Sequence, residues 1–79
     1  MKVYIVNWEQ IMDDYTDWGT IGVYQSESDA RAAISNLHKG IFDPLPTVTI
    51  FETQLGSQIQ VTPNGAFVGN LTLIDTIKL

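Results

Sequence analysis

The chain contains no cysteine and a single histidine among its 79 residues. Disulfide bonds are therefore excluded, and a structural zinc site is not expected because such sites are built chiefly from Cys and His. A domain of this length buries only roughly 60% of the surface of its unfolded chain. Its stability must then come from its apolar residues, which form 44% of the sequence, or from an oligomer interface. We predict neither a metal nor another cofactor.

Basic residues are also scarce. Four Lys and Arg stand against nine Asp and Glu, which gives a net charge of −5. Because contacts to a phosphate backbone need a basic surface, direct binding to nucleic acid is disfavoured, and so is binding to a membrane surface. No run approaches the about 18 apolar residues of a membrane span, and MKVYIVNW lacks the basic-then-apolar pattern of a signal peptide. We expect a cytoplasmic protein.

Residues 20–41 (TIGVYQSESDARAAISNLHKGI) indicate a strand followed by a short helix. Ser26 and Asp29 form the S-x-x-D pattern in which the serine oxygen accepts from an amide of the first turn. Four residues follow the i, i+3, i+4, i+7 spacing of one apolar stripe, which predicts a helix lying on a sheet: Ala30, Ala33, Ile34 and Leu37.

The end of this helix is predicted at Gly40. His38 and Lys39 are expected in the last turn, where positive charge is favoured by the helix dipole. Gly40 has the conformational freedom to close the helix, and Ile41 is expected to fold back on the last turn.

The first half of the chain also predicts two strands. Residues 2–8 (KVYIVNW) are β-branched or aromatic on both faces, which is typical of a central strand. Residues 9–19, with three aspartates and a glycine, are predicted to form a long loop. Residues 20–24 resume as a strand that pairs antiparallel with the first.

The second half predicts strands at residues 47–55 (TVTIFETQL), 58–62 (QIQVT) and 71–79 (LTLIDTIKL). The first two are expected to form a hairpin about Gly56-Ser57. Pro63-Asn64-Gly65 is expected to form a second turn. In the last strand Asp75 interrupts an otherwise apolar face.

Together these elements predict one α+β domain over residues 1–79. It is a small antiparallel sheet of roughly four to six strands with one helix on one face, in the order β-β-α-β-β-β. The other face is expected to stay partly exposed, which predicts a homodimer. The aromatic residues expected to include exposed members are Tyr4, Trp8, Tyr24 and Phe51.

The acidic, aromatic segment within residues 9–19 is the candidate site. Carboxylates near a glycine suit a hard cation, but the D-x-D-x-D-G spacing of a calcium loop and its distant Glu are absent. A solvated loop is one alternative, with Trp18 covering the edge of the core. A protein-contact surface is another, because aromatic residues are enriched at interfaces. We predict that this partner-binding surface consists of Asp13, Asp14, Tyr15, Asp17 and Trp18.

No residue pattern indicates catalysis. A serine nucleophile would need His38 as its base, and the dipole at the helix end accounts for that residue. The acids do not sit in an apolar motif that would raise a pKa, and no G-x-G-x-x-G or phosphate loop occurs. We predict a protein without catalytic residues that is not an enzyme.

The segments KVYIVNW and IGVYQSESDARAAI resemble parts of a group of small phage and bacterial proteins of unknown function. Those proteins begin with a K-V-Y-I-V strand, continue through an acidic or aromatic loop, and reach a G-V-[YF]-x-S-x-x-x-A junction between strand and helix. The resemblance covers about the first half of the chain and does not extend to Pro63-Asn64-Gly65. It implies an origin in a phage or another mobile element, and so a place in the host cytoplasm.

Two functions remain open. The first is a non-enzymatic binding protein that docks on a basic surface of a partner protein. Some phage inhibitors of host nucleic-acid-handling or defence machinery act in this way, and the chain would then be anti-CRISPR-like. The second is a structural or accessory module that self-assembles through an exposed sheet face, with its acids serving solubility. Acids gathered on one side favour the first, and scattered acids with a large apolar self-interface favour the second.

Overall fold

A computed structural model describes residues 1–57, 59–61 and 67–79 of the chain. The elements, in chain order, are β1 (Lys2–Ile11), β2 (Thr16–Tyr24), α1 (Glu27–Ser35), the 3-10 turn η1 (Lys39–Ile41), β3 (Thr47–Gln54), β4 (Ile59–Val61), β5 (Phe67–Gly69) and β6 (Thr72–Lys78). The predicted α+β class with an antiparallel sheet is confirmed. One more strand follows the helix than the predicted order contains.

Four strands form the main sheet in the order β2-β1-β3-β6, with every neighbouring pair antiparallel. β1 is central, as its apolar residues on both faces predict. Val6 is fully buried on the face toward α1, and Val3 and Ile5 are at most 9% exposed on the other face. Both faces of β1 therefore contribute to the buried interior.

The predicted loop at residues 9–19 is wrong, because β1 and β2 extend through most of it as a hairpin. β1 continues to Ile11 and β2 already begins at Thr16. The Met12 amide donates to the Tyr15 carbonyl at 2.8 Å, which closes the turn. The loop was predicted because the segment contains three aspartates, but their positions are compatible with a hairpin. Two of them occupy the turn, where Asp is favoured, and the third lies on an edge strand where its carboxylate reaches solvent.

The beginning of α1 is confirmed. Ser26 has extended backbone angles (φ −139°, ψ 154°), and its Oγ accepts from the Asp29 amide at 3.1 Å. Ala30 and Ile34 are buried against the sheet, while Ala33 and Leu37 are half-buried. The predicted stripe therefore faces the sheet, with its centre most deeply buried.

The predicted end of α1 is wrong. The helix ends at Ser35, and the amide of its cap residue Asn36 donates to carbonyls of the last turn. No basic residue lies in that turn. His38 is exposed beyond it, and Gly40 belongs to η1. The short polar side chain of Asn competes for backbone hydrogen bonds and so favours helix ends. Beyond Asn36 the chain continues through η1 to β3.

The connector between η1 and β3 packs along the far end of β1. The ring of Phe42 meets that of Trp8 edge-on with centroids 5.2 Å apart. The Gln10 amide nitrogen donates to the Pro44 carbonyl at 2.6 Å, and Pro46 is fully buried. Gly19 lies opposite Trp8, where a Cβ atom would come within 2.7 Å of the indole nitrogen.

The predicted hairpin of β3 with β4 is wrong. The chain does turn after β3, with the Ser57 amide donating to the Gln54 carbonyl at 3.0 Å and Gly56 at a φ of 88°. However, β3 already pairs with β1 on one side and β6 on the other, so neither of its edges is open to β4. β4 instead pairs with β5 in a separate two-stranded ribbon. The predicted turn at residues 63–65 lies outside the described residues.

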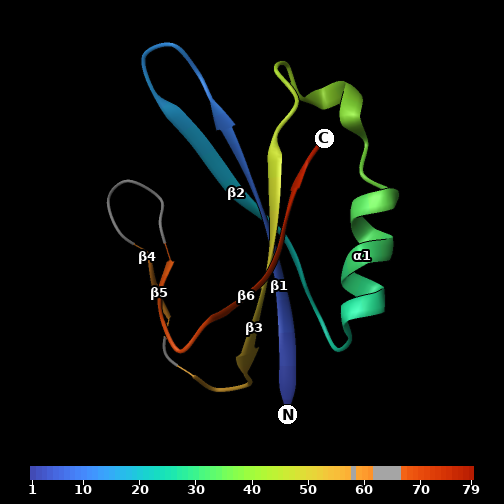
Figure 1. Ribbon diagram of the computed structural model, residues 1–79, viewed down its shortest axis with the longest axis vertical. Coiled ribbons are helices and arrows are strands. Elements are labelled where there is room, and N and C mark those ends of the chain that lie inside the picture. The colour runs from blue at the N-terminus through green and yellow to red at the C-terminus, as the bar shows by residue number, and fades with distance from the viewer. Residues whose placement is uncertain (58, 62–66) are drawn as a thin grey trace.

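Figure 1 shows the main sheet nearly edge-on, with α1 on one side and the β4–β5 ribbon on the other. On the α1 side, the buried core consists of Val6, Ala30, Ile34, Val48 and Ile50. Tyr4, Trp8 and Tyr24 pack against this core, so the expectation that they lie on the opposite, exposed face is wrong. Phe51 does lie on the opposite face, where it is half-buried.

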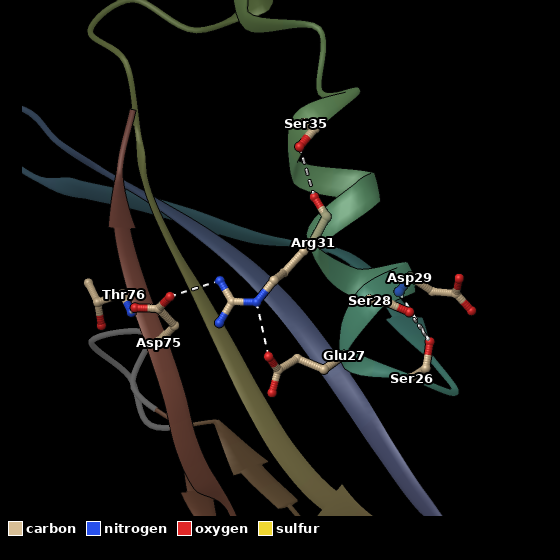
Figure 2. A network of polar contacts seen from close by, with 8 residues as sticks. All are labelled: Ser26, Glu27, Ser28, Asp29, Arg31, Ser35, Asp75 and Thr76. Carbon is tan, nitrogen blue, oxygen red and sulfur yellow. Dashed lines mark hydrogen bonds and ion pairs between the residues drawn. The ribbon is translucent and has the colours of Figure 1, made fainter.

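Arg31 links the helix to the far edge of the sheet (Figure 2). Its Nε donates to Glu27 at 3.0 Å and its Nη1 donates to Asp75 of β6 at 2.9 Å. Asp75 pairs with the buried Ile50, so it faces the helix side. This contact explains why an acid interrupts the apolar face of the last strand. Within the described residues, the single α-helix is too short to span a bilayer.

Candidate functional site

The predicted site residues lie at the end of the β1–β2 hairpin, which projects at the upper left of Figure 1. Asp13, Asp14 and Tyr15 occupy its turn and are exposed. Asp17 and Trp18 follow on β2. The structure therefore brings all five residues to one end of the molecule. We call residues 9–18 the hairpin end.

The five residues do not share one face. Asp17 pairs with Gln10 and Trp18 pairs with Glu9. Because neighbouring residues of a strand point to opposite faces, Asp17 lies on the α1 side of the sheet and Trp18 on the other side. The hairpin end consequently presents acids on both of its faces as well as at its turn.

Exposed apolar and aromatic groups accompany these acids. Tyr15 is 63% exposed at the turn, and Trp18 is 36% exposed on β2. Ile11 is 71% exposed and lies diagonally across from Trp18, on the same face. Sequence reasoning missed Ile11 because it was assigned to a loop. Its odd-numbered phase with Val3 and Ile5 would have placed it on a strand.

Asp17 also has a structural contact. Its Oδ1 accepts from the amide of Trp18 at 3.0 Å. One oxygen of this carboxylate is therefore turned toward its own strand. Asp13 and Asp14 differ from it in lying at the turn itself, beyond the last paired residues of the two strands.

The acids of the chain are distributed unevenly. Among the described side chains, three of the nine acids form ion pairs: Glu52 with Lys2, and Glu27 and Asp75 with Arg31. Five of the remaining six are exposed at or beside the hairpin end: Glu9, Asp13, Asp14, Asp17 and Asp43. We call these five residues the acidic end.

Asp43 joins this group through the connector. It precedes Pro44, whose carbonyl accepts from Gln10 on the hairpin. Sequence reasoning missed it because this contact spans 34 residues. Lys78 lies in the same row of the sheet as Glu9, across β3, so its positive charge lies near the acidic end.

An open hollow of about 320 Å³ lies at the opposite end of the sheet, between Glu52–Gln54 of β3 and residues 69–72. The register pairs Lys2 with Gln54 and Glu9 with Thr47, so this hollow and the acidic end are separated by the length of β1. Among the described residues, no three His, Cys, Asp or Glu side chains are grouped closely enough to share a metal ion. The acidic end thus offers carboxylates and apolar contacts on an open surface.

Comparison of the chain with protein-family models, with curated proteins and with solved structures finds no match. The resemblance to small phage proteins therefore stays one of two short segments, and the origin it implies stays a prediction.

Proposed function

We propose that the chain is a small, non-enzymatic binding protein whose acidic end docks on a basic surface of a partner protein. The observation that carries this proposal is the gathering of five exposed carboxylates at one end of the molecule, beside Tyr15, Trp18 and Ile11. Charges at the rim of an interface steer the encounter, whereas aromatic and aliphatic anchors hold the complex.

The partner that fits best is a protein whose basic groove normally holds a nucleic acid. Such a groove is lined by Lys and Arg that contact phosphates, and a projecting hairpin with carboxylates on both faces and at its tip would meet such side chains from several sides. Occupying the groove would inhibit the partner. Host nucleic-acid-handling or defence machinery is the corresponding target class for a phage-encoded protein in the host cytoplasm.

Self-assembly through the sheet face opposite α1 is the second hypothesis. Val23 and Leu73 are 59% and 56% exposed on that face, which gives it some apolar surface. However, Ile5 and Asn7 at its centre are at most 9% exposed, and the β4–β5 ribbon lies on this side (Figure 1). Val23 and Leu73 lie on the outer strands. Ile11 and Trp18, which share this face, lie at the hairpin end. Because none of these exposed residues lies at the centre of the face, we favour the docking function.

The proposal is tested by affinity capture from a bacterial lysate. The wild-type chain is compared with a triple variant that carries Asp13→Asn, Asp14→Asn and Asp17→Asn. We expect the wild type to retain a nucleic-acid-binding protein that the triple variant loses, and we expect added nucleic acid to displace it. Asp29→Asn is the matched control, because it removes an exposed acid at the start of α1. Capture of the same proteins by the triple variant would refute the proposal.

A further inference from the structure

The two outer strands of the main sheet, β2 and β6, each have a strand neighbour on one side only among the described strands. The other side of such a strand presents backbone N–H and C=O groups that a strand of another molecule can pair with. A small antiparallel sheet needs a means of preventing this pairing. Both edges of this sheet contain the same two features.

The first feature on β2 is a side chain that accepts a hydrogen bond from a backbone amide facing away from the sheet. Residues of an antiparallel strand alternate between those whose backbone bonds the neighbouring strand and those whose backbone faces away. Tyr15 accepts from Met12 across the hairpin, so by alternation Asp17 also faces β1 and the amide of Trp18 faces outward. The Oδ1 of Asp17 accepts from this outward amide at 3.0 Å.

β6 repeats the arrangement. The Leu79 amide donates to the Pro46 carbonyl at 3.4 Å, so by the same alternation the amide of Thr76 faces outward. The Oδ1 of Asp75 accepts from it at 2.8 Å. The second oxygen of Asp75 accepts from Arg31, which holds the carboxylate in place (Figure 2).

The second feature is a bulge close to each occupied amide. On β2, Gly22 pairs with Val6 of β1 and Thr20 pairs with Asn7. Ile21 between them has no partner residue on β1 and is the extra residue of the bulge. On β6, Asp75 pairs with Ile50 of β3 and Leu73 pairs with Phe51. Ile74 between them is the extra residue of the second bulge. A bulge bends and twists an edge strand, so an incoming strand cannot follow it in register.

We propose that Asp17 and Asp75 close the two edges of the sheet against strand addition. Each carboxylate accepts a hydrogen bond from an outward amide within three residues of a bulge. On the described part of each edge strand, the row of outward amides is therefore interrupted both at this amide and at the bulge. The chain then associates with partners through side chains and not by adding a strand. This inference concerns self-association and is independent of the proposed docking function.

The test compares Asp17→Ala with Asp17→Asn. Both remove the charge, but the Asn side chain keeps an Oδ1 that accepts from the Trp18 amide. We expect hydrogen exchange at the Trp18 amide to speed up about fivefold in Asp17→Ala, the factor that corresponds to a net hydrogen bond of about 1 kcal/mol, and to change little in Asp17→Asn. The Thr76 amide should likewise exchange faster in Asp75→Ala than in Asp75→Asn, whose Oδ1 can still accept from this amide although the contact with Arg31 is lost.

Sedimentation over a range of protein concentrations measures the consequence. We expect the double variant Asp17→Ala/Asp75→Ala to self-associate more than the wild type, and Asp17→Asn/Asp75→Asn to remain like the wild type. Asp13→Ala/Asp14→Ala is the control for the loss of two negative charges alone. Circular dichroism confirms that each variant is folded, and Asp17→Ala alone supplies the test if loss of the Arg31 contact unfolds the Asp75 variants.

Two results would overturn the inference. One is equal self-association of the Ala and Asn double variants. The loss of charge, and not the loss of the hydrogen bond to the edge amide, would then explain the self-association. The other is an unchanged state of association and unchanged Trp18 exchange in Asp17→Ala. Docking on a basic partner is expected to weaken in both Asp17 variants, so a failure of the edge proposal is distinguishable from a failure of the proposed function.

Discussion

Short polar side chains that bond to backbone amides shape this structure at the scale of single residues. Ser26 accepts a hydrogen bond from an amide in the first turn of α1. Asp17 and Asp75 each accept one from the amide of the following residue in their strand. The first contact could be predicted, because the S-x-x-D spacing is local in the sequence. The Asp75 site could not, because its second partner, Arg31, is 44 residues away and meets it only once α1 lies on the sheet.

The pH dependence of stability follows from this contact. The pKa of the Asp75 carboxyl lies below its ordinary 3.8, chiefly because Arg31 donates to it and also because the Thr76 amide does. A carboxyl with a lowered folded pKa stabilises the fold above its unfolded pKa, and this contribution is lost as the pH falls through the folded value. The loss therefore occurs below 3.8.

We expect Arg31→Gln to be less stable than the wild type at neutral pH, with a difference that shrinks as the pH falls below the ordinary 3.8 of the Asp75 carboxyl. Urea unfolding midpoints at several pH values measure both proteins. Asp75→Asn, which cannot lose a proton, is the matched variant and should show the same convergence. A stability difference that stays constant from neutral to acid pH would contradict the prediction.

At the scale of elements, the sequence predicted where helices and strands occur better than how they pair. α1 begins where its cap predicts, and β1 is central because both of its faces are apolar. Pairing depends on which edges are already occupied. β3 lies between β1 and β6, so the turn at Gly56 leads to the separate ribbon instead of to a third neighbour.

The hairpin end shows the same limit. Aspartates at residues 13, 14 and 17 indicated a loop by local preference, yet cross-strand pairs such as Glu9 with Trp18 continue both strands through this region. Strand propensity is a weak guide on an edge strand, where one side of the backbone and much of the side chain reach solvent. The five candidate residues are exposed, but their distribution over two faces follows only from the strand register.

Packing of α1 on the sheet gives a prediction for a single element. Ile34 is 6% exposed and lies in the core with Val6 and Ile50. We expect Ile34→Ala to lower the free energy of unfolding by about 2–5 kcal/mol, since truncation removes apolar contacts and leaves a cavity. Denaturant titration measures this change.

Leu55→Ala is the matched control for that measurement. Leu55 is 66% exposed just after β3, so its truncation should change the free energy by about 0.5 kcal/mol or less. Equal effects of the two substitutions would mean that α1 does not bury Ile34 against the sheet.

At the scale of the whole molecule, the exposed acids of the acidic end and the buried core lie at different positions along β1. The core lies beneath α1, and the connector through Phe42 and Pro44 supports the base of the hairpin end. This support gives the projecting strands a defined position, which a docking surface needs if it is to avoid a large ordering cost on binding. The base of the acidic end is therefore tied to the rest of the fold, and we expect its charged and aromatic residues to contribute to different steps of association.

These steps can be resolved by binding kinetics with a partner obtained from the affinity capture. We expect Asp13→Asn/Asp14→Asn to slow association and to flatten its dependence on salt, because exposed charges act mainly on the encounter. Trp18→Ala and Tyr15→Ala should instead speed dissociation, because they remove buried contact. Circular dichroism establishes that each variant is folded. The contrary outcome is that all of these variants bind like the wild type while Val23→Asp or Leu73→Asp abolishes binding. The working surface would then be the sheet face opposite α1, and the acidic end would serve solubility alone.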